Sequence, residues 1–247
     1  MARTVLVCGT STSGKTSSME NLKNPEKVLF LNAEVTKGED LPFKNNFMKR
    51  LVLDPLAELA GPNNYFRQAA KNSDKIETIV LDSFTLMTEM YVKKYVKTVE
   101  NKLLLKAWGE LHDFLINVLT NEIPPLKQNV IITAHTTDIY NNDQAIMEHK
   151  VKLPGSISNI GFEAYFNNIV SCKKVGLDKL QSYDNPLLHI TEDDEINGYK
   201  HVIQTRLTKD TRYERIRSNR DMWDVKETYI DNDIQLVLNR LNEYYGD

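Results

Sequence analysis

The sequence predicts an α/β protein with a mostly parallel central sheet flanked by helices, and an antiparallel extension toward the C-terminus. Over the first 135 residues, four short apolar runs, each ending at polar residues, alternate with segments of helical or loop character. Continuous apolar runs of this length are typical of strands buried on both faces, as in parallel sheets. Strands that alternate with helices are the pattern of α/β folds.

The four runs predict strands at residues 3–8, 28–31, 76–81 and 129–134. A loop rich in glycine and hydroxyl residues follows the first strand, and a helix is expected after it. Between the third and fourth strands, apolar residues recur at helical spacing over 84–120. This spacing predicts one long helix or two, closed by the prolines at 124 and 125.

The C-terminal part has a different pattern of polar and apolar residues. Residues 136–158 are polar and predict a long surface loop, whereas 166–175 and 199–207 predict two further strands. The acidic run at 192–195, followed by Asn-Gly, indicates a hairpin connection between them. Asp233 precedes an amphipathic pattern that predicts a final helix.

We expect a single domain over 1–247, because no repeat, low-complexity tract or linker is recognisable. Its core would comprise about 1–175, and the C-terminal strands and helix about 176–247.

The composition excludes several classes of protein. The 247 residues are 41% hydrophobic and 26% charged, which excludes a fibrous or wholly disordered chain. No stretch approaches the ~18 consecutive apolar residues of a membrane span, and the N-terminal run is too short for a signal peptide. Cys8 and Cys172 have neither disulfide-framework nor zinc-site spacing. We therefore expect a cytoplasmic protein, and its net charge of −3 means that any nucleic-acid site must be a local patch.

Residues 9–16 match the motif G-x-x-x-x-G-K-[ST] at every fixed position. In this motif the N–H groups of a curled backbone face phosphate oxygens, Lys15 reaches the β and γ phosphates, and the Thr16 hydroxyl binds Mg²⁺. The alternative, a chance glycine-serine loop before a helix, is disfavoured by the strand in front of it. The predicted nucleotide-binding residues are Gly9, Thr10, Ser11, Thr12, Ser13, Gly14, Lys15, Thr16 and Ser17.

Three polar residues end the other predicted strands. Asp82 is the expected second anchor for Mg²⁺ beside Thr16, and the alternative is a helix cap. Glu34 is placed to activate an attacking water, and the alternative is a solvated loop acid. His135 is a candidate sensor of the γ-phosphate, and the alternative is a structural histidine. Lys15, Glu34 and His135 form the predicted catalytic set.

Several motifs, taken in chain order, resemble the RecA/RadA-type ATPase core. More closely, they resemble the short phage-encoded RecA-like NTPases, which are ATP-binding proteins of single-strand annealing and recombination. The resemblance covers about residues 3–225 and is most specific in the first 135. It is carried by the phosphate loop, Phe30–Glu34 (FLNAE), Ile79–Phe84 (IVLDSF) and Asn129–His135 (NVIITAH).

The resemblance implies a function. The acid matching Glu34 would be catalytic, Asp82 would be the Walker B acid, and His135 would couple ATP to a DNA-binding loop at about 136–161. The protein would couple Mg·ATP binding and hydrolysis to single-stranded DNA in phage recombination, annealing or replication, in the host cytoplasm. The implied partners are single-stranded DNA, further copies in a ring or other oligomer, and a single-strand DNA-binding protein.

A basic stretch at 200–220 holds seven Lys or Arg against two acids and has three interpretations. In the first, it is a patch that contacts a nucleic-acid backbone, with Tyr213 as a stacking platform for a base. In the second, it supplies an arginine finger to a neighbouring protomer. In the third, it is a solvated face paired with the acids at 192–195. The family's late Lys-x-Arg pair is not cleanly present, so the in-trans candidates are Arg215, Arg217 and Arg220. The DNA-binding candidates are Lys150, Lys152, Arg206, Lys209 and Arg212.

Two other function classes stay open. A small-molecule kinase would need a lid of converging arginines, which the 200–220 stretch resembles, but Glu34 in its Ala-Glu context favours hydrolysis. A nucleotide-dependent protein switch would hydrolyse slowly and respond to a protein partner.

Overall fold

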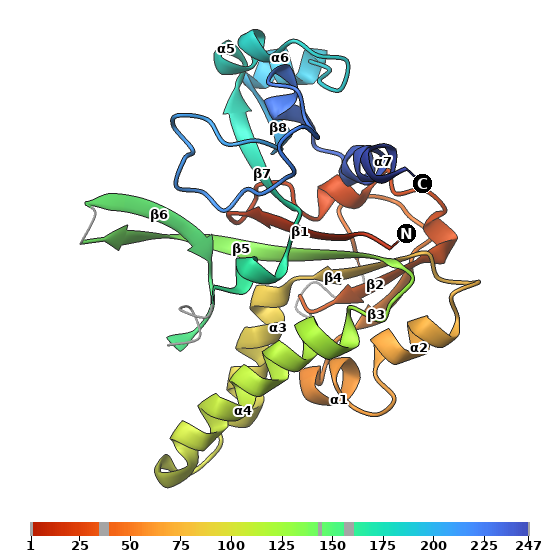
Figure 1. Ribbon diagram of the computed structural model, residues 1–247, viewed down its shortest axis with the longest axis vertical. Coiled ribbons are helices and arrows are strands. Elements are labelled where there is room, and N and C mark those ends of the chain that lie inside the picture. The colour runs from red at the N-terminus through yellow and green to blue at the C-terminus, as the bar shows by residue number, and fades with distance from the viewer. Residues whose placement is uncertain (1, 35–39, 143–144, 156–160, 247) are drawn as a thin grey trace.

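The computed structural model describes residues 2–34, 40–142, 145–155 and 161–246. Within these ranges nine strands form one sheet in the order β3-β2-β4-β5-β1-β7-β8-β9, with β6 paired to β5 (Figure 1). The strands are β1 (Thr4–Gly9), β2 (Val28–Asn32), β3 (Met48–Leu51), β4 (Thr78–Asp82), β5 (Asn129–Asn141), β6 (Ile146–Val151), β7 (Ile169–Gly176), β8 (Tyr199–Gln204) and β9 (Tyr229–Asp231). The α-helices are α1 (Pro55–Leu59), α2 (Tyr65–Lys71), α3 (Phe84–Tyr91), α4 (Leu104–Asn117), α5 (Leu177–Leu180), α6 (Glu192–Asn197) and α7 (Ile234–Tyr245).

The predicted fold class is confirmed. Strands β3, β2, β4, β5, β1 and β7 run parallel to one another, whereas β8 and β9 add to the C-terminal edge in antiparallel pairing. The four strands predicted in the first half correspond to β1, β2, β4 and β5. The short strands β3 and β9 were not predicted, because three or four residues carry too little periodicity to be recognised.

The sheet is buried on both faces, which explains the continuous apolar runs of its central strands. Alternate side chains of β1 belong to different cores: Leu6 packs with α1 to α4 on one face, and Val7 packs with α7 on the other. Figure 1 shows α1 to α4 gathered on one side of the sheet and α7 on the opposite side. Burial on both faces is typical of parallel sheets, in which crossover connections place the carboxyl ends of the strands at one edge.

The segment 84–120 forms two helices, one of the two predicted outcomes. α3 and α4 each continue into a π-helical turn, at Val92–Val96 and Val118–Glu122, and together they extend away from the sheet. At their far end Leu103, Leu104 and Leu105 are exposed.

The prediction of a long loop at 136–158 is wrong for residues 136–141 and 146–151, which form strands, whereas 152–155 lie outside any strand. β5 continues to Asn141 and returns as β6, so that the two strands form a hairpin, hereafter the β5–β6 hairpin. Residues 143–144 and 156–158 of the predicted loop lie outside the described residues. The segment was interpreted as a loop because it is polar overall. It nevertheless contains β-branched and aromatic residues such as Thr136, Ile139 and Tyr140, which favour strands when they pair across a hairpin.

The predicted hairpin connection at 192–198 is also wrong, because this segment is the helix α6. Thr191 accepts a hydrogen bond from the backbone of Asp194, whose side chain accepts one from the backbone of Thr191. This capping box and the acids of the first turn stabilise a helix start, and Gly198 ends the helix in a left-handed conformation. The final helix is confirmed as α7, with Asp233 as its N-cap.

None of the helices in the described ranges is long and apolar enough to cross a membrane. The single-domain organisation over 1–247, with its core at about 1–175, stays a prediction.

Truncation of Leu111 should show that the α4 face of the core stabilises the fold. Leu111 is fully buried, so Leu111→Ala is expected to lower the free energy of unfolding by about 2–5 kcal/mol. Leu105→Ala, in the same helix but 86% exposed, should change it by no more than about 0.5 kcal/mol. Denaturant titration followed by circular dichroism measures both, and equal effects would contradict the packing described.

Candidate nucleotide-binding site

Parallel pairing brings the ends of β1, β2 and β4 close to His135, which lies within β5 because this strand continues to Asn141. Gly9, at the end of β1, pairs with His135 on β5, and Asn32, at the end of β2, pairs with Asp82 on β4. The loop that follows β1 therefore emerges at the same edge as Glu34, Asp82 and His135. Residues more than 120 positions apart in the chain meet here because the carboxyl ends of parallel strands share one edge.

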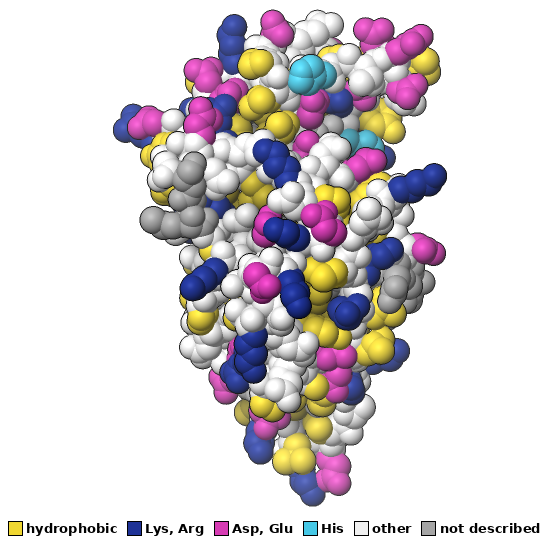
Figure 2. Space-filling model, turned by 90° about the vertical axis from the view of Figure 1, so that its right-hand side faces the viewer, with side chains coloured by type: hydrophobic (Ala, Val, Ile, Leu, Met, Phe, Trp, Pro, Cys, Tyr) yellow, Lys and Arg dark blue, Asp and Glu magenta, His cyan; other side chains and the backbone are white. Residues whose placement is uncertain are grey.

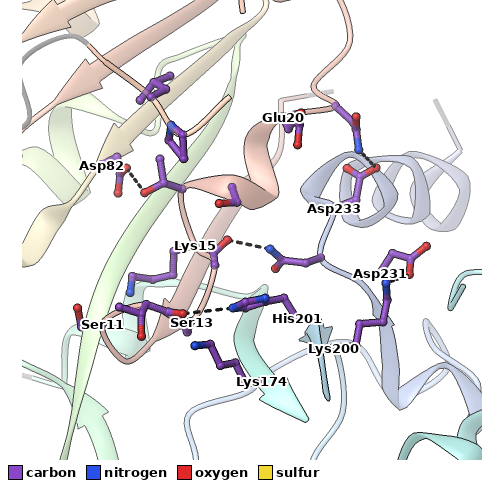
Figure 3. Close-up of a pocket in the computed structure, with 18 of the residues that line it drawn as sticks. Ser11, Ser13, Lys15, Glu20, Asp82, Lys174, Lys200, His201, Asp231 and Asp233 are labelled. Atoms are coloured by element: carbon purple, nitrogen blue, oxygen red, sulfur yellow. Dashed lines mark hydrogen bonds and ion pairs between the residues drawn. The ribbon is translucent and has the colours of Figure 1, made fainter. Parts of the chain in front are cut away.

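A cavity of about 1300 Å³ lies over this edge (Figure 3). Its lining includes residues 11–17 of the predicted phosphate loop together with Glu34, Asp82 and His135. The opposite wall comes from the C-terminal extension and includes Lys174, Lys200, His201, Asp231 and Asn232. Gly9 and Thr10 line instead a smaller cavity of about 330 Å³ on the side of the loop that faces the β5–β6 hairpin.

Thr16 and Asp82, the two predicted Mg²⁺ anchors, lie in direct contact. The Thr16 hydroxyl donates to Asp82 Oδ2 at 2.8 Å, and the Thr133 hydroxyl donates to Oδ1 at 2.5 Å. Hydroxyl and carboxylate oxygens are ligands that Mg²⁺ prefers, so the pair fits this ion. No group of three or more His, Cys, Asp or Glu among the described residues is arranged to hold a metal. Waters and nucleotide phosphates would complete the coordination.

The three predicted catalytic residues are neighbours. Lys15 Nζ donates to the carbonyls of Gly9 and Thr10 at 3.0 and 2.7 Å, and lies 3.4 Å from His135 Nδ1. An ammonium group only donates, so Nδ1 accepts, and neutral His135 carries its proton on Nε2. His135 Nε2 lies 3.6 Å from Glu34 Oε1. His135 thus lies between the phosphate-loop lysine and the candidate base.

Burial shifts the pKa values of two ionisable groups of the site in opposite directions. Desolvation lowers the pKa of the Lys15 ammonium, although the charges of Asp82 and Glu34 oppose this shift. Desolvation also raises the pKa of the Asp82 carboxyl, opposed by the hydrogen bonds from Thr133 and Thr16. Burial thus disfavours the charged form of both groups. A nucleotide phosphate near Lys15 and a cation near Asp82 would each favour that charged form again.

The helix predicted after the phosphate loop is reduced to a short 3₁₀ turn at Ser17–Met19. The Ser18 hydroxyl donates to the backbone carbonyl of Lys15 at 2.6 Å. Short hydroxyl side chains compete in this way for backbone groups and lower helix propensity.

The in-trans arginine candidates do not converge. Arg215 forms an ion pair with Glu148 at 2.6 Å, and Arg217 donates to the carbonyl of Phe166 at 3.2 Å. Arg220 is exposed. None of the three lines the 1300 Å³ cavity.

The DNA-binding candidates divide into two groups. Lys150 pairs with Glu148 on β6, and Arg212 stacks on the ring of Tyr213, whose carbonyl accepts from the backbone of His149 at 3.3 Å. These residues lie along the β5–β6 hairpin. Elsewhere, Arg206 donates to the carbonyl of Trp223, Lys209 is exposed, and Lys152 pairs with Glu89.

Sequence reasoning missed several residues of the site. Thr133 could have been noticed in the sequence as a polar residue within a predicted apolar strand. In the structure its hydroxyl donates to Asp82. Thr85, which accepts from the His135 backbone at 3.0 Å, follows Asp82 closely in sequence. The C-terminal wall, with Lys174, His201 and Asn232, had no local signal because only the sheet order brings it to the loop.

The fold and the loop together place the protein in the P-loop class, whose loop is built to hold nucleotide phosphates. A protein-family model described as an AAA domain matches residues 1–168, more than half of the chain. The chain therefore belongs to the AAA domain family, and this membership indicates a nucleotide-binding ATPase. The match ends just before β7, so the C-terminal wall of the cavity lies outside it. No curated protein sequence matches the chain.

The raised pKa of Asp82 predicts a pH-dependent effect of Asp82→Asn on the nucleotide-free protein. The folded state holds this proton more tightly than the unfolded state, so ionisation of Asp82 costs stability as the pH rises through its folded pKa. Asp82→Asn should therefore stabilise the protein at pH 7–8, by about 1 kcal/mol. The gain should shrink as the pH falls through the folded pKa of Asp82 toward its ordinary value of 3.8.

Thermal unfolding over this pH range measures the difference. Asp113→Asn removes the same charge from a side chain that is 86% exposed and serves as the control. A destabilised Asp82→Asn protein at pH 8 would contradict the proposed cost of the buried charge.

Proposed function

We propose that this protein is a Mg·ATP-dependent ATPase whose ATP binding and hydrolysis are coupled to single-stranded DNA. The observation that carries the ATPase part is the grouping of Lys15, Thr16, Glu34, Asp82 and His135 around one phosphate loop. The DNA part rests on the RecA-like resemblance and on the β5–β6 hairpin that continues from His135.

Each residue has a role that its position supports. The amides of residues 11–17 and Lys15 would hold the phosphates, while Thr16 and Asp82 would hold Mg²⁺, which supplies charge stabilisation to the transferring phosphoryl group. Glu34 is 8% exposed and would orient and deprotonate the attacking water. His135, between Lys15 and Glu34, would detect whether the γ-phosphate is present.

Replacement of the proposed base should separate binding from hydrolysis. Glu34→Gln keeps the size of the side chain and removes its basicity, so kcat is expected to fall by about 10²–10⁴-fold while ATP still binds. Steady-state phosphate release gives kcat, and calorimetric titration with ATP gives the Kd. Glu110→Gln, at a side chain 58% exposed on α4, is the matched control. Unchanged turnover in Glu34→Gln would remove Glu34 from the mechanism.

The β5–β6 hairpin has a direct connection to the proposed sensor. The carbonyl of His135 accepts from the backbone N–H of Lys152 at 2.8 Å, which closes the base of the hairpin. A shift of His135 on release of the γ-phosphate would therefore act on both hairpin strands.

The side chains of the hairpin and its neighbour suit single-stranded nucleic acid. Tyr140 and Met147 face each other across the hairpin and are 55% and 45% exposed. The segment with Arg212 and Tyr213 lies beside β6, next to Lys150. Aromatic faces that stack on bases, beside cations that contact phosphates, are the usual means of binding single strands. The face seen in Figure 2 instead has basic and acidic side chains interspersed.

We further propose that the protein serves in recombination, annealing or replication, as the resemblance to phage-encoded RecA-like proteins implies. Self-association would bring an arginine of one copy to the nucleotide bound by its neighbour. The candidates for this arginine are Arg215, Arg217 and Arg220. A single-strand DNA-binding protein is a further proposed partner.

The DNA part is tested by ATP hydrolysis with and without single-stranded DNA, with Lys15→Ala as the blank. Wild-type turnover should rise with DNA, and Lys150→Glu combined with Arg212→Glu should abolish the rise. The double variant should also show a shallower slope of log Kd against log salt, by about 0.7 for each DNA phosphate that it no longer neutralises. Lys102→Glu, 75% exposed at the far end of the α3–α4 protrusion, should behave as wild type.

Turnover indifferent to DNA, with no DNA retained at low salt, would overturn the coupling. Transfer of the γ-phosphate to a small-molecule acceptor would then indicate a kinase, and dependence of turnover on a protein partner would indicate a switch.

A further inference from the structure

Two side chains of the C-terminal extension contact the backbone of the phosphate loop. His201, on β8, places Nε2 3.3 Å from the carbonyl oxygen of Thr12. Asn232, directly after β9, donates from Nδ2 to the carbonyl oxygen of Gly14 at 2.9 Å. Figure 3 shows His201 on the side of the phosphate loop away from Asp82, and both His201 and Asn232 line the cavity. Neither residue belongs to the predicted site, and both lie outside the segment matched by the family model.

These contacts help to set the direction of two amide groups. The Thr12 carbonyl contacts His201, and the Gly14 carbonyl accepts both from Asn232 and from the backbone N–H of Ser18, each at 2.9 Å. In a planar trans peptide the C=O and the following N–H point in opposite directions. The Thr12 carbonyl shares its peptide plane with the N–H of Ser13, and the Gly14 carbonyl shares its plane with the N–H of Lys15. A donor that holds each carbonyl outward therefore turns the next N–H toward the inside of the loop, where phosphate oxygens bind in P-loops.

The chemistry of both contacts admits only one orientation. A carbonyl oxygen only accepts, so His201 must carry a proton on Nε2, and Asn232 must present its NH₂ group. Asn232 Oδ1 is buried and has no hydrogen-bond partner among the described residues. Its amide is therefore oriented by the bond from Nδ2 to Gly14.

The backbone of the loop has two positive φ angles where the two side chains approach it. Thr12 has a φ of 61°, which is uncommon for a residue other than glycine. Gly14 has a φ of +92°, and a Cβ there would lie 2.7 Å from Asn232 Nδ2 and 3.2 Å from His201 Cδ2. Only glycine permits the two side chains to approach this closely.

The segments that carry His201 and Asn232 are joined to each other. Lys200, which precedes His201, lies 3.4 Å from the carboxylate of Asp231, which precedes Asn232. The same carboxylate accepts from the backbone and ring of His189 at 3.0 and 2.6 Å. Strands β8 and β9 also pair with each other, so both loop contacts come from one connected part of the extension.

We propose that His201 and Asn232 are positioning residues that hold the Ser13 and Lys15 amides toward bound phosphate, so that the C-terminal extension sets the affinity for ATP. The inference rests on the proposed ATPase function, since it concerns the same nucleotide. Asn232→Leu and His201→Phe remove a donor at nearly constant volume, and His201→Gln keeps one.

Two measurements test the proposal. In the nucleotide-free protein, hydrogen exchange in the peptide that covers residues 9–16 should accelerate in Asn232→Leu and His201→Phe. Each of these variants should bind ATP about tenfold more weakly by calorimetric titration, with KM raised more than kcat is lowered. His201→Gln should recover most of the affinity. Asn239→Leu, on α7 away from the loop, is the matched control.

The outcomes separate this proposal from the proposed function. Unchanged exchange and affinity in both variants would overturn it, as would equal effects in His201→Gln and His201→Phe, which indicate only a packing role. Faster exchange with weaker ATP binding would support it even if DNA failed to stimulate hydrolysis. Failure of the wild-type protein to bind ATP would overturn both proposals, whereas absence of turnover with retained ATP binding would overturn only the ATPase assignment.

Discussion

The parallel pairing of β1, β2, β4 and β5 decides which side chains meet at the nucleotide site. Each strand is buried on both faces, so two separate cores hold its register, while the crossover connections set its direction. The register places Gly9 beside His135 and Asn32 beside Asp82. A shift of one residue in any of these pairs would turn the buried side chains to the wrong core and would also separate the phosphate loop from its acid partner.

The site concentrates groups that oppose folding. Asp82 is 3% and Lys15 5% exposed, and burial disfavours the charged form of both. Hydrogen bonds from two threonines to Asp82 and from Lys15 to loop carbonyls offset part of this cost. In the proposed function, a phosphate and a divalent cation would supply charges opposite to those of Lys15 and Asp82, while the surrounding apolar cores stabilise the fold.

Prediction from the sequence succeeded where local pattern and tertiary environment agree. The central strands were recognisable because burial on both faces leaves uninterrupted apolar runs, and α7 because Asp233 caps an amphipathic pattern. The β5–β6 hairpin was missed because its half-exposed strands carry polar residues whose partners lie across the hairpin. At 192–197, the acidic run favours a turn by composition alone, whereas its capping box with Thr191 stabilises a helix.

The phosphate loop was recognisable from the sequence alone, because nine consecutive residues contain the glycines, lysine and hydroxyls that phosphate binding requires. The sequence also predicted strand ends at Glu34, Asp82 and His135. In the structure Asp82 ends β4 and Glu34 follows β2, whereas His135 lies within β5 and pairs with Gly9 at the end of β1. The residues that contact the loop from the opposite wall of the cavity were not predictable in this way. His201 and Asn232 lie 189 and 218 positions from the loop residues that they contact. They reach it because β8 and β9 join the sheet beyond β7, and no local pattern of residues encodes that order of strands.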